Sequence, residues 1–396
     1  MNRPNAAIVG VGMTPVGVCP ERSSVGLAAQ ALQAALADAG IGRDQVDGLA
    51  WSLGRPSGED YDTTAEALGL NLRFVNQTWT HGRFAGTCVI VAALAVESGL
   101  ADFVACIGGI RRIATNTPAS YGVLPHGDLR AHGFGQFADE GALALRRYLH
   151  VHGVEPSRLA DVVVALRRNA SLNPGAWLRT PLSRDDYLAM PFVVDPLRAA
   201  DCFPANAAGV PLNDSGVCVI VGRRDALPAG SRPAVHVLAG QGLQAGREET
   251  YFGRPGLGLF TQAASSFAPT PRDLRVYDLA GLRPADVDGF YTYDAFSSLV
   301  WFALERFGHC APGEAPRWAS AERLSFDGGL PTNTNGGLIG EGHTGGWGHL
   351  VEIARQLRHE AGARQIRNAS VLQWATVFGD ALLFTNDRAL LGRAPS

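Results

Sequence analysis

The sequence contains no lysine, since all 34 residues counted as lysine or arginine are arginine. A chain without lysine cannot form a lysine Schiff base, which excludes class I aldolases and enzymes that anchor pyridoxal phosphate on lysine. It also lacks the lysine that a Walker phosphate loop requires. The chemistry of the protein must therefore depend on other side chains.

Cysteine is scarce, and long apolar runs are absent. Six cysteines are scattered over 396 residues without a C-x-x-C pair, which indicates reduced and mostly buried thiols. No apolar run reaches the length of a membrane span, and the first residues, MNRPNAAIVGVG, lack the layout of a signal peptide. The net charge of −3 gives no indication of a nucleic-acid partner. We therefore expect a cytoplasmic protein that contacts neither membranes nor nucleic acids.

Hydrophobic periodicity predicts alternating helices and strands along the chain. The stretch AAIVGVGMTPVG at 6–17 predicts a buried strand, and its glycine spacing does not fit the G-x-G-x-x-G of a dinucleotide site. Ser23 or Ser24 is expected to cap a helix that ends at Gly40. Further strands are predicted at 46–53, 102–109, 214–226 and twice within 371–385, and further helices at 86–98, 158–174 and 349–362.

A repeat indicates duplication. The stretches 39–51 and 280–292 share the frame A-G-[Ile/Leu]-x4-Val-Asp-Gly-[Leu/Phe], which predicts a helix end, a short turn and a strand each time. They lie about 240 residues apart, which is too far for a short-period solenoid. We therefore expect two βα-rich halves, 1–230 and 231–396, with a long excursion over about 115–200 in the first half.

The densest local signal is GGLIGEGHTGGWGH at 336–349, where seven glycines surround His343 and His349. Glycine in a folded segment costs backbone entropy, so such a cluster indicates a backbone that turns sharply or is approached closely. The sequence leaves open what approaches it.

Five stretches carry a resemblance to a known family: YDAF at 293–296, FGHCAPGEA at 307–315, NGGLIGEGH at 335–343, GGWGHLVEIARQLR at 345–358 and PLRAADCFPANAAGVPLNDSGVCVIV at 196–221. With the duplication, they resemble the thiolase superfamily, and most closely its sterol-carrier/lipid-transfer-protein branch. The resemblance implies an α/β thiolase fold, in which two pseudo-equivalent βαβαβαββ halves form a five-layered αβαβα arrangement. It also implies a coenzyme A thioester as substrate, with no other cofactor and no metal.

The resemblance implies site residues as well. His343 matches the histidine of the thiolase Gly-His-Pro motif, although Thr344 replaces the proline, and Tyr293 stands where thiolases have the asparagine of Asn-Glu-Ala-Phe. In thiolases these two positions hold the thioester oxygen and assist proton transfer. Bare backbone near His343 would let a flat thioester lie close, so we expect substrate contacts at Gly342, Gly345 and Gly346.

Both thiolase cysteines are missing. The nucleophile position, three residues before Gly86, falls on Arg83 or, with a one-residue shift, on Gly82 in THGRFAG at 80–86, and no cysteine occurs near 373–375. Cys88 lies further along an apolar helix, where a core role is expected. We expect His81, beside the vacant position, to be catalytic, and Arg83 and Asp294 to contact substrate.

Without these thiols no covalent acyl-enzyme of the thiolase kind can form. An enolate-stabilising site still supports retro-aldol cleavage of a β-hydroxyacyl-CoA, and cysteine-less members of the branch are similar, some being aldolases of steroid side-chain CoA thioesters. Two alternatives stay open: an acyltransferase or Claisen-type condensing enzyme, and a non-catalytic acyl-CoA-binding subunit. The branch further implies a homodimer and a small OB-fold, zinc-ribbon partner protein.

Several of the candidates have a simpler interpretation. Tyr291 and Tyr293 alternate on one predicted strand, so one of them could be packing. His349 opens a helix, which favours a structural role, and His150 and His152 do not share a helical face, which disfavours a zinc site. The segments 115–140 and 248–262 are expected to shape the acyl pocket, whose occupant the sequence does not identify.

Overall fold

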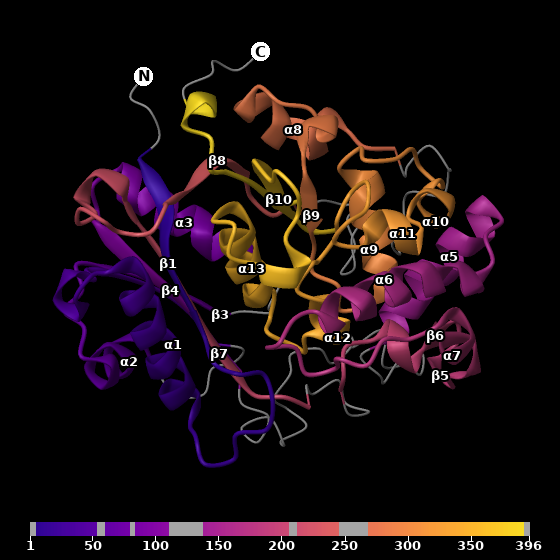
Figure 1. Cartoon of the computed structure of the whole chain (residues 1–396), viewed down its shortest axis with the longest axis horizontal. Coiled ribbons are helices and arrows are strands. Elements are labelled where there is room, and N and C mark those ends of the chain that lie inside the picture. Colours follow the sequence, from indigo (N-terminus) through magenta and orange to yellow (C-terminus); the bar gives the residue numbers. More distant parts are fainter. Residues whose placement is uncertain are drawn as a thin grey trace.

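The computed structural model describes residues 5–53, 60–79, 84–110, 138–205, 212–244 and 268–391. A nine-stranded sheet runs through the molecule in the order β3-β2-β4-β7-β1-β8-β11-β10-β9, and β5 and β6 form a separate pair (Figure 1). The sheet divides into two similar parts at the junction of β1 and β8.

The first part of the sheet has one antiparallel strand among parallel ones. Its strands are β1 (Ala6–Met13), β2 (Gly48–Leu53), β3 (Phe74–Trp79), β4 (Phe103–Ile110) and β7 (Ser215–Arg223). Strand β2 pairs in parallel with β3 and β4, whereas β7 pairs antiparallel with both β4 and β1.

The second part repeats this pattern with β8 (Val235–Gln241), β9 (Gly289–Tyr291), β10 (Val371–Ala375) and β11 (Ala381–Thr385). Strand β10 is parallel to β9, and β11 is antiparallel to β10 and β8. A parallel bridge between Phe290 and Thr332 stands where the first part has β3. The two parts join where β1 and β8 pair at Ala7–His236 and Ile8–Val235.

Helices cover the sheet in layers. Helix α1 (Ser24–Ala39) packs on β1, β4 and β7, and α8 (Pro271–Ala280) packs on β8 and β11. Helices α3 (Ala85–Glu97) and α13 (Trp347–Leu357) each contact strands of both parts, so they form the layer between them (Figure 1). This is the expected five-layered αβαβα arrangement, and the predicted fold class is confirmed.

Strand alternation creates the two faces of the first part of the sheet. In β1, Ala7 and Val9 belong to the core cluster beneath α1, whereas Ala6 and Ile8 belong to the larger cluster that contains α3. Successive strand side chains point to opposite faces, so a strand covered on both faces becomes a continuous apolar run. This explains why the sequence at 6–13 reads as buried throughout.

The predicted repeat is confirmed. Ser23 caps α1, its hydroxyl accepting a hydrogen bond from the Gly26 N–H at 3.0 Å. Helices α1 and α8 end at Gly40 and Gly281, which have left-handed φ angles of 70° and 63°. Each glycine leads through a short 3₁₀ turn into a strand, β2 or β9. Glycine adopts this conformation without steric cost, which is why the frame keeps it.

The excursion between β4 and β7 crosses to the second half. It contains α5 (Asp139–His152), α6 (Ala160–Ser171), α7 (Arg184–Ala189), β5 (Phe192–Val194) and β6 (Leu197–Arg198). Helix α6 packs against α9 (Ser297–Arg306), α11 (Ala321–Leu324) and α12 (Gly337–Gly340), all of the second half. The remaining α-helices in the described ranges are α2 (Tyr61–Leu68) and α10 (Ala315–Trp318). The first half therefore supports the glycine-rich loop of the second.

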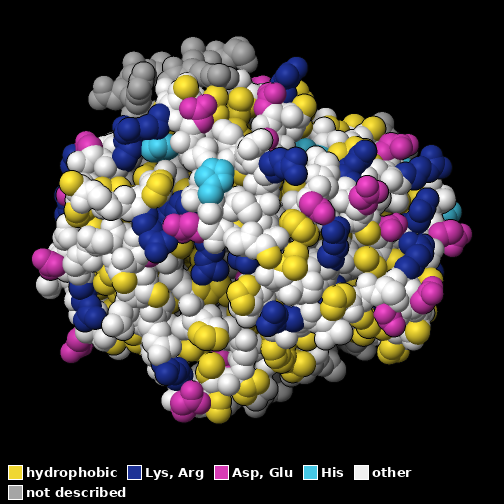
Figure 2. Space-filling model, viewed as in Figure 1, with side chains coloured by type: hydrophobic (Ala, Val, Ile, Leu, Met, Phe, Trp, Pro, Cys, Tyr) yellow, Lys and Arg dark blue, Asp and Glu magenta, His cyan; other side chains and the backbone are white. Residues whose placement is uncertain are grey.

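Some predictions differ from the structure or lie outside it. The helix predicted to reach Gly362 ends at Leu357, because His359 adopts a left-handed φ of 59° and a 3₁₀ turn follows. Most of 115–140 and all of 248–262 lie outside the described residues. No helix in the described part of the chain is long and apolar enough to cross a membrane. Figure 2 shows acidic and basic side chains interspersed over the face in view.

Candidate functional site

Tyr293 and His343 meet in the interior of the second half. Tyr293 follows β9 and His343 follows α12, 50 residues apart in the chain. The Tyr293 hydroxyl oxygen lies 3.2 Å from His343 Nε2, and the two rings meet edge-on with 6.2 Å between their centroids. Both side chains are almost fully buried. The two residues that the sequence singled out first are therefore in hydrogen-bond contact.

The surroundings of His343 keep its imidazole neutral. The ring of Phe203 packs against it with 4.4 Å between ring centroids. Burial lowers the pKa of His343 to about 4, because removing water disfavours the charged form. Around neutral pH the ring is then uncharged, and it is better suited to donate a hydrogen bond than to hold an extra proton.

His343 leaves one ring nitrogen of this pair free. A neutral imidazole carries one N–H, and Nδ1 of His343 has no hydrogen-bond partner among the described residues. If the proton is on Nδ1, Nε2 accepts from Tyr293 and the Nδ1–H is free. If it is on Nε2, that N–H donates to the Tyr293 oxygen. The tautomer with the proton on Nδ1 can offer one hydrogen bond to a substrate oxygen.

The backbone of His343 is held by Asn213. The Asn213 side-chain amide accepts a hydrogen bond from the His343 N–H at 2.8 Å and donates one to the His343 carbonyl at 3.1 Å. Beside it, Gly342 has a φ of 110°, and a Cβ there would lie 2.7 Å from Val16. The group that closely approaches the Gly342 backbone is therefore a side chain of the protein.

The other glycines of the loop are also approached by protein atoms. A Cβ on Gly336 or Gly340 would lie 2.5 or 2.8 Å from the Cβ of Ala170 on α6. A Cβ on Gly337 would meet the Asp294 carboxylate at 2.1 Å. The dense glycine pattern thus reflects internal packing. Substrate contact at Gly342, Gly345 and Gly346 stays a prediction, and all three have the positive φ that glycine tolerates.

Asp294 fastens the strand end to the glycine-rich loop. Its carboxylate accepts hydrogen bonds from the Leu338 N–H at 2.9 Å, the Ile339 N–H at 3.4 Å and His349 Nε2 at 3.0 Å. With both oxygens engaged inside the protein, Asp294 has a structural role next to Tyr293. Its predicted contact with substrate stays untested.

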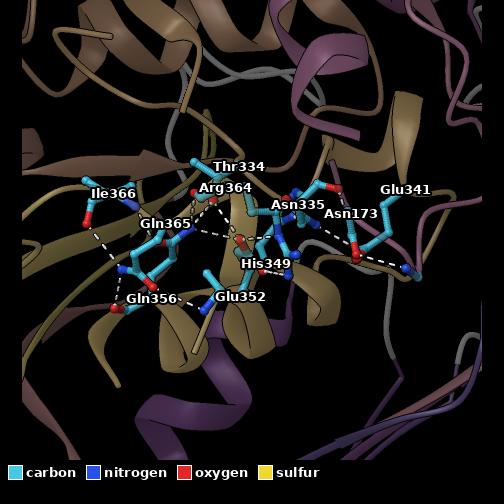
Figure 3. Close-up of polar contacts among 12 residues, drawn as sticks. Asn173, Thr334, Asn335, Glu341, His349, Glu352, Gln356, Arg364, Gln365 and Ile366 are labelled. Atoms are coloured by element: carbon cyan, nitrogen blue, oxygen red, sulfur yellow. Dashed lines mark hydrogen bonds and ion pairs between the residues drawn. The ribbon is translucent and has the colours of Figure 1, made fainter. Parts of the chain in front are cut away.

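His349 belongs to the same buried network, which Figure 3 shows around Asn335 and Glu341. The Asn335 side-chain nitrogen donates to His349 Nδ1 at 3.0 Å and to Glu341 Oε2 at 2.6 Å. Because Nδ1 accepts a hydrogen bond, the ring proton belongs on Nε2, where it is donated to Asp294. His349 is thus a structural link between two loops, in agreement with its simpler interpretation.

Helix α13 carries a buried polar stripe that was not predicted. His349, Glu352 and Gln356 are spaced by three and four residues, so they share one helical face. Glu352 forms a buried ion pair with Arg364 at 2.7 Å and accepts a hydrogen bond from Thr334 at 2.8 Å (Figure 3). The spacing of these three residues could have predicted a shared polar face, but the apolar pattern of the same helix is stronger.

The two tyrosines near β9 have different environments. The strand ends at Tyr291, so Tyr293 lies beyond it, and the expected alternation on one strand is wrong. The Tyr291 hydroxyl lies 2.7 Å from Thr334, inside the α13 network. Tyr291 is the packing residue of the two, and Tyr293 is the one that reaches His343.

Comparison with known proteins places this geometry in a family. The thiolase C-terminal domain-like family matches residues 273–388. A steroid side-chain-cleaving aldolase of Thermomonospora curvata is 30% identical over 89% of this chain and 90% of its own length. The chain belongs to the thiolase superfamily.

Further relatives refine the position within the superfamily. The 17-hydroxy-3-oxo-4-pregnene-20-carboxyl-CoA lyase of Mycobacterium tuberculosis is 30% identical over 89% of this chain and 91% of its own length. Sterol carrier protein 2 of Gallus gallus is 26% identical over 96% of this chain and 70% of its own length. The Ltp2-ChsH2(DUF35) aldolase structure superposes with a TM-score of 0.82 at 27% identity, covering 98% of this chain and 99% of that one. The chain is thus a sterol-carrier-protein-2-like thiolase homologue that resembles the aldolases.

Of the two places where thiolases carry a thiol, one is described in full. His81 and Arg83, at the first, lie outside the described residues, and helix α3 begins just after them at Ala85. The second, at 373–375, lies buried in β10, and the turn 376–380 that follows it is fixed by protein contacts. Arg306 donates to the Val377 carbonyl at 2.6 Å, and Gln241 donates to the Gly379 carbonyl at 2.7 Å.

The thiols elsewhere in this thiolase homologue are not activated. Cys88 is buried within α3, and Cys202, which precedes Phe203, is buried as well. Burial raises the pKa of Cys202 and of Cys19, Cys106, Cys218 and Cys310. A nucleophilic cysteine needs the opposite shift, because the thiolate is the reactive form. The prediction of reduced, mostly buried thiols is confirmed.

Proposed function

We propose that the chain is a thiolase-fold lyase that cleaves the Cα–Cβ bond of a β-hydroxyacyl-CoA by a retro-aldol reaction, stabilising the enolate without a cysteine. The observation that supports this most directly is the hydrogen-bonded pair Tyr293–His343, 3.2 Å apart in a buried site without an activated thiol among the described residues. The aldolases and lyases that are 30% identical to this chain support the same reaction class.

The proposed reaction is balanced without a cofactor. A base takes the proton of the β-hydroxyl group, the C–O bond becomes a carbonyl, and the Cα–Cβ electron pair moves onto the thioester. The Nδ1–H of His343, which has no partner among the described residues, holds the resulting enolate oxygen. A preorganised donor of this kind is worth about 3–4 kcal/mol. The enolate then takes a proton at Cα, so the products are a ketone or aldehyde and a shortened acyl-CoA.

The name of the mycobacterial relative describes a suitable substrate type for this proposal. In a 17-hydroxy steroid 20-carboxyl-CoA, the thioester carbonyl is attached to C20, which is therefore Cα, and the neighbouring C17 carries the hydroxyl, so the hydroxyl is β to the thioester. We propose a substrate of the same type, a β-hydroxyacyl-CoA, for this chain. Its acyl group stays open, since the two segments expected to shape the pocket lie largely outside the described residues.

Partners form a second part of the proposal. The similar aldolase structure is named as a complex with a DUF35 protein, which supports the expected small OB-fold, zinc-ribbon partner. For the expected homodimer, β3 is the outermost strand at its end of the described sheet, and Leu94 and Leu100 at the end of α3 are 63% and 54% exposed. Light scattering measures how many copies of this chain each particle contains. A single copy, both in the protein alone and in its complex with the DUF35 protein, would contradict the dimer.

The deciding experiment is cleavage of a panel of β-hydroxyacyl-CoAs by the purified protein, alone and co-expressed with a DUF35 protein encoded beside it. The expected result is a shortened CoA ester and a carbonyl product in equal amounts, detected by mass spectrometry. An acyl adduct on the intact protein would contradict the lyase and support the acyltransferase. Turnover of the complex that is unchanged by both H343A and Y293F would support a non-catalytic subunit.

A further inference from the structure

We infer that Asn213 is a positioning residue for His343: through its side chain the first half fixes the backbone of His343 and thereby orients the imidazole in the second half. This inference rests on the proposed function, since it concerns the same pair. Asn213 lies 130 residues before His343 in the chain and is fully buried.

The contact has the geometry of a backbone pairing. The Asn213 carboxamide presents one acceptor and one donor side by side, and both are used by the N–H and the C=O of His343, at 2.8 and 3.1 Å. Two hydrogen bonds to the same residue fix the position of its Cα and the direction of its Cα–Cβ bond. The imidazole then retains only its side-chain rotations, and the rings of Phe203 and Tyr293 border it.

The neighbouring residue anchors Asn213 itself. The Asp214 N–H donates to the Gly17 carbonyl at 2.6 Å, and the Asp214 carboxylate accepts from the Cys19 N–H at 2.7 Å. Val16, just before this contact, packs on Gly342, the residue preceding His343. The segment after β1 thus contacts Gly342 through Val16, and the segment before β7 binds the His343 backbone through Asn213.

Position matters here because the proposed donor acts only at short range. A misplacement of about 1 Å in a catalytic group costs about 100-fold in rate. We therefore expect N213A to lower kcat by about 100-fold with KM within about two-fold of the parent, as for an interaction that acts on the transition state. N213D keeps the size and the acceptor but turns the donor into an oxygen facing the His343 carbonyl, so kcat should fall similarly in a folded protein.

The matched control is Asn169, another fully buried asparagine that holds backbone groups. It donates to the Thr332 carbonyl at 3.0 Å and accepts from the Phe326 N–H at 2.9 Å, with no hydrogen bond to His343. N169A removes comparable contacts, so a kcat loss caused by general loosening would appear in both variants. We expect the loss in the Asn213 variants only.

A spectroscopic readout separates this inference from the proposed activity. The chain has 10 histidines, and the imidazole signals of His343 can be assigned by their loss in H343Q after labelling of histidine. We expect N213A and N213D to shift or split the His343 signals and N169A to leave them unchanged, even if no substrate is ever cleaved. Unchanged His343 signals and unchanged kcat in a folded N213D protein would overturn the inference. Failure of the parent to cleave any CoA ester would overturn only the proposed function.

Discussion

The glycine-rich loop at 336–349 and the β10–β11 turn at 376–380 lie in the same half of the molecule, and they differ in how they are built. The loop holds His343 beside Tyr293, and His343 keeps an imidazole nitrogen without a partner in the described structure. In the turn, Thr376 donates to Asp380, Trp374 donates to the same carboxylate at 3.1 Å, and Arg306 holds the backbone.

The difference lies in how much hydrogen-bonding capacity each segment leaves unused. A site needs a polar group whose hydrogen-bonding capacity is not fully used inside the protein, and the loop retains one. In the turn, both oxygens of Asp380 are used internally, and burial raises the pKa of this carboxyl to about 6. We therefore expect activity to respond to changes in the loop, and stability to respond to changes in the turn.

The largest expected effect comes from removing the pair itself. Y293F and H343A should each lower kcat by about 10²–10³-fold, the usual cost of one preorganised donor. Because the two groups act through one hydrogen bond, the double variant should lose little more than either single variant. Steady-state kinetics of the four proteins tests this, and fully multiplicative losses would contradict a joint role.

A smaller effect is expected from filling the space beneath the loop. In G340A the new methyl group would lie 2.8 Å from Ala170 on α6, so the helix and the loop must separate. Such overpacking typically costs about 1–3 kcal/mol of unfolding free energy. Urea denaturation measures it, with G17A as the control, since a Cβ at Gly17 meets nothing within 4 Å. Equal stability of the two variants would show that the contact of α6 with the loop is not tight.

A substitution in the turn 376–380 should lower the free energy of unfolding and leave kcat almost unchanged. T376V removes the hydroxyl that donates to Asp380 and accepts from the Phe378 N–H at 3.1 Å. Loss of a buried hydrogen-bond partner costs about 1–3 kcal/mol. We expect that destabilisation with kcat within about two-fold of the parent. A loss of kcat as large as that of Y293F would place the turn in the catalytic machinery.

The smallest expected effect is the response of kcat to pH. With its pKa lowered to about 4, His343 stays neutral above pH 5, so kcat should show no inflection near 6.5 from this group. The unfolded chain binds a proton at this histidine near pH 6.5 and the folded chain does not, so the corresponding stability is lost as the pH falls from about 6.5 toward 4. A kinetic inflection near 6.5 that vanishes in H343Q would contradict a buried neutral imidazole.

Much of the scaffold could be predicted from the sequence, because its signals are local. The caps at Ser23 and Gly40 and the apolar runs of β1 and α3 depend on residues within one element. The duplicated frame at 39–51 and 280–292 predicted the two-part sheet for the same reason, since each copy carries its own turn chemistry.

The site was only partly predictable, because its contacts join distant segments. His343 and Tyr293 were found through their resemblance to family motifs. Asn213 and Phe203 carry no local pattern, and their roles arise from the topology that brings 203–213 next to 343. The glycines drew attention to the right loop, but their neighbours turned out to be α6, Asp294 and Val16.

The excursion helix α6 lies against Gly336 and Gly340, although it belongs to the other copy of the duplicated unit. A chain divided between β7 and β8 would therefore yield two fragments, neither of which can shape the His343 loop alone. Recovery of enzymatic turnover on mixing such fragments would report their reassembly, which makes this scaffold suited to complementation assays.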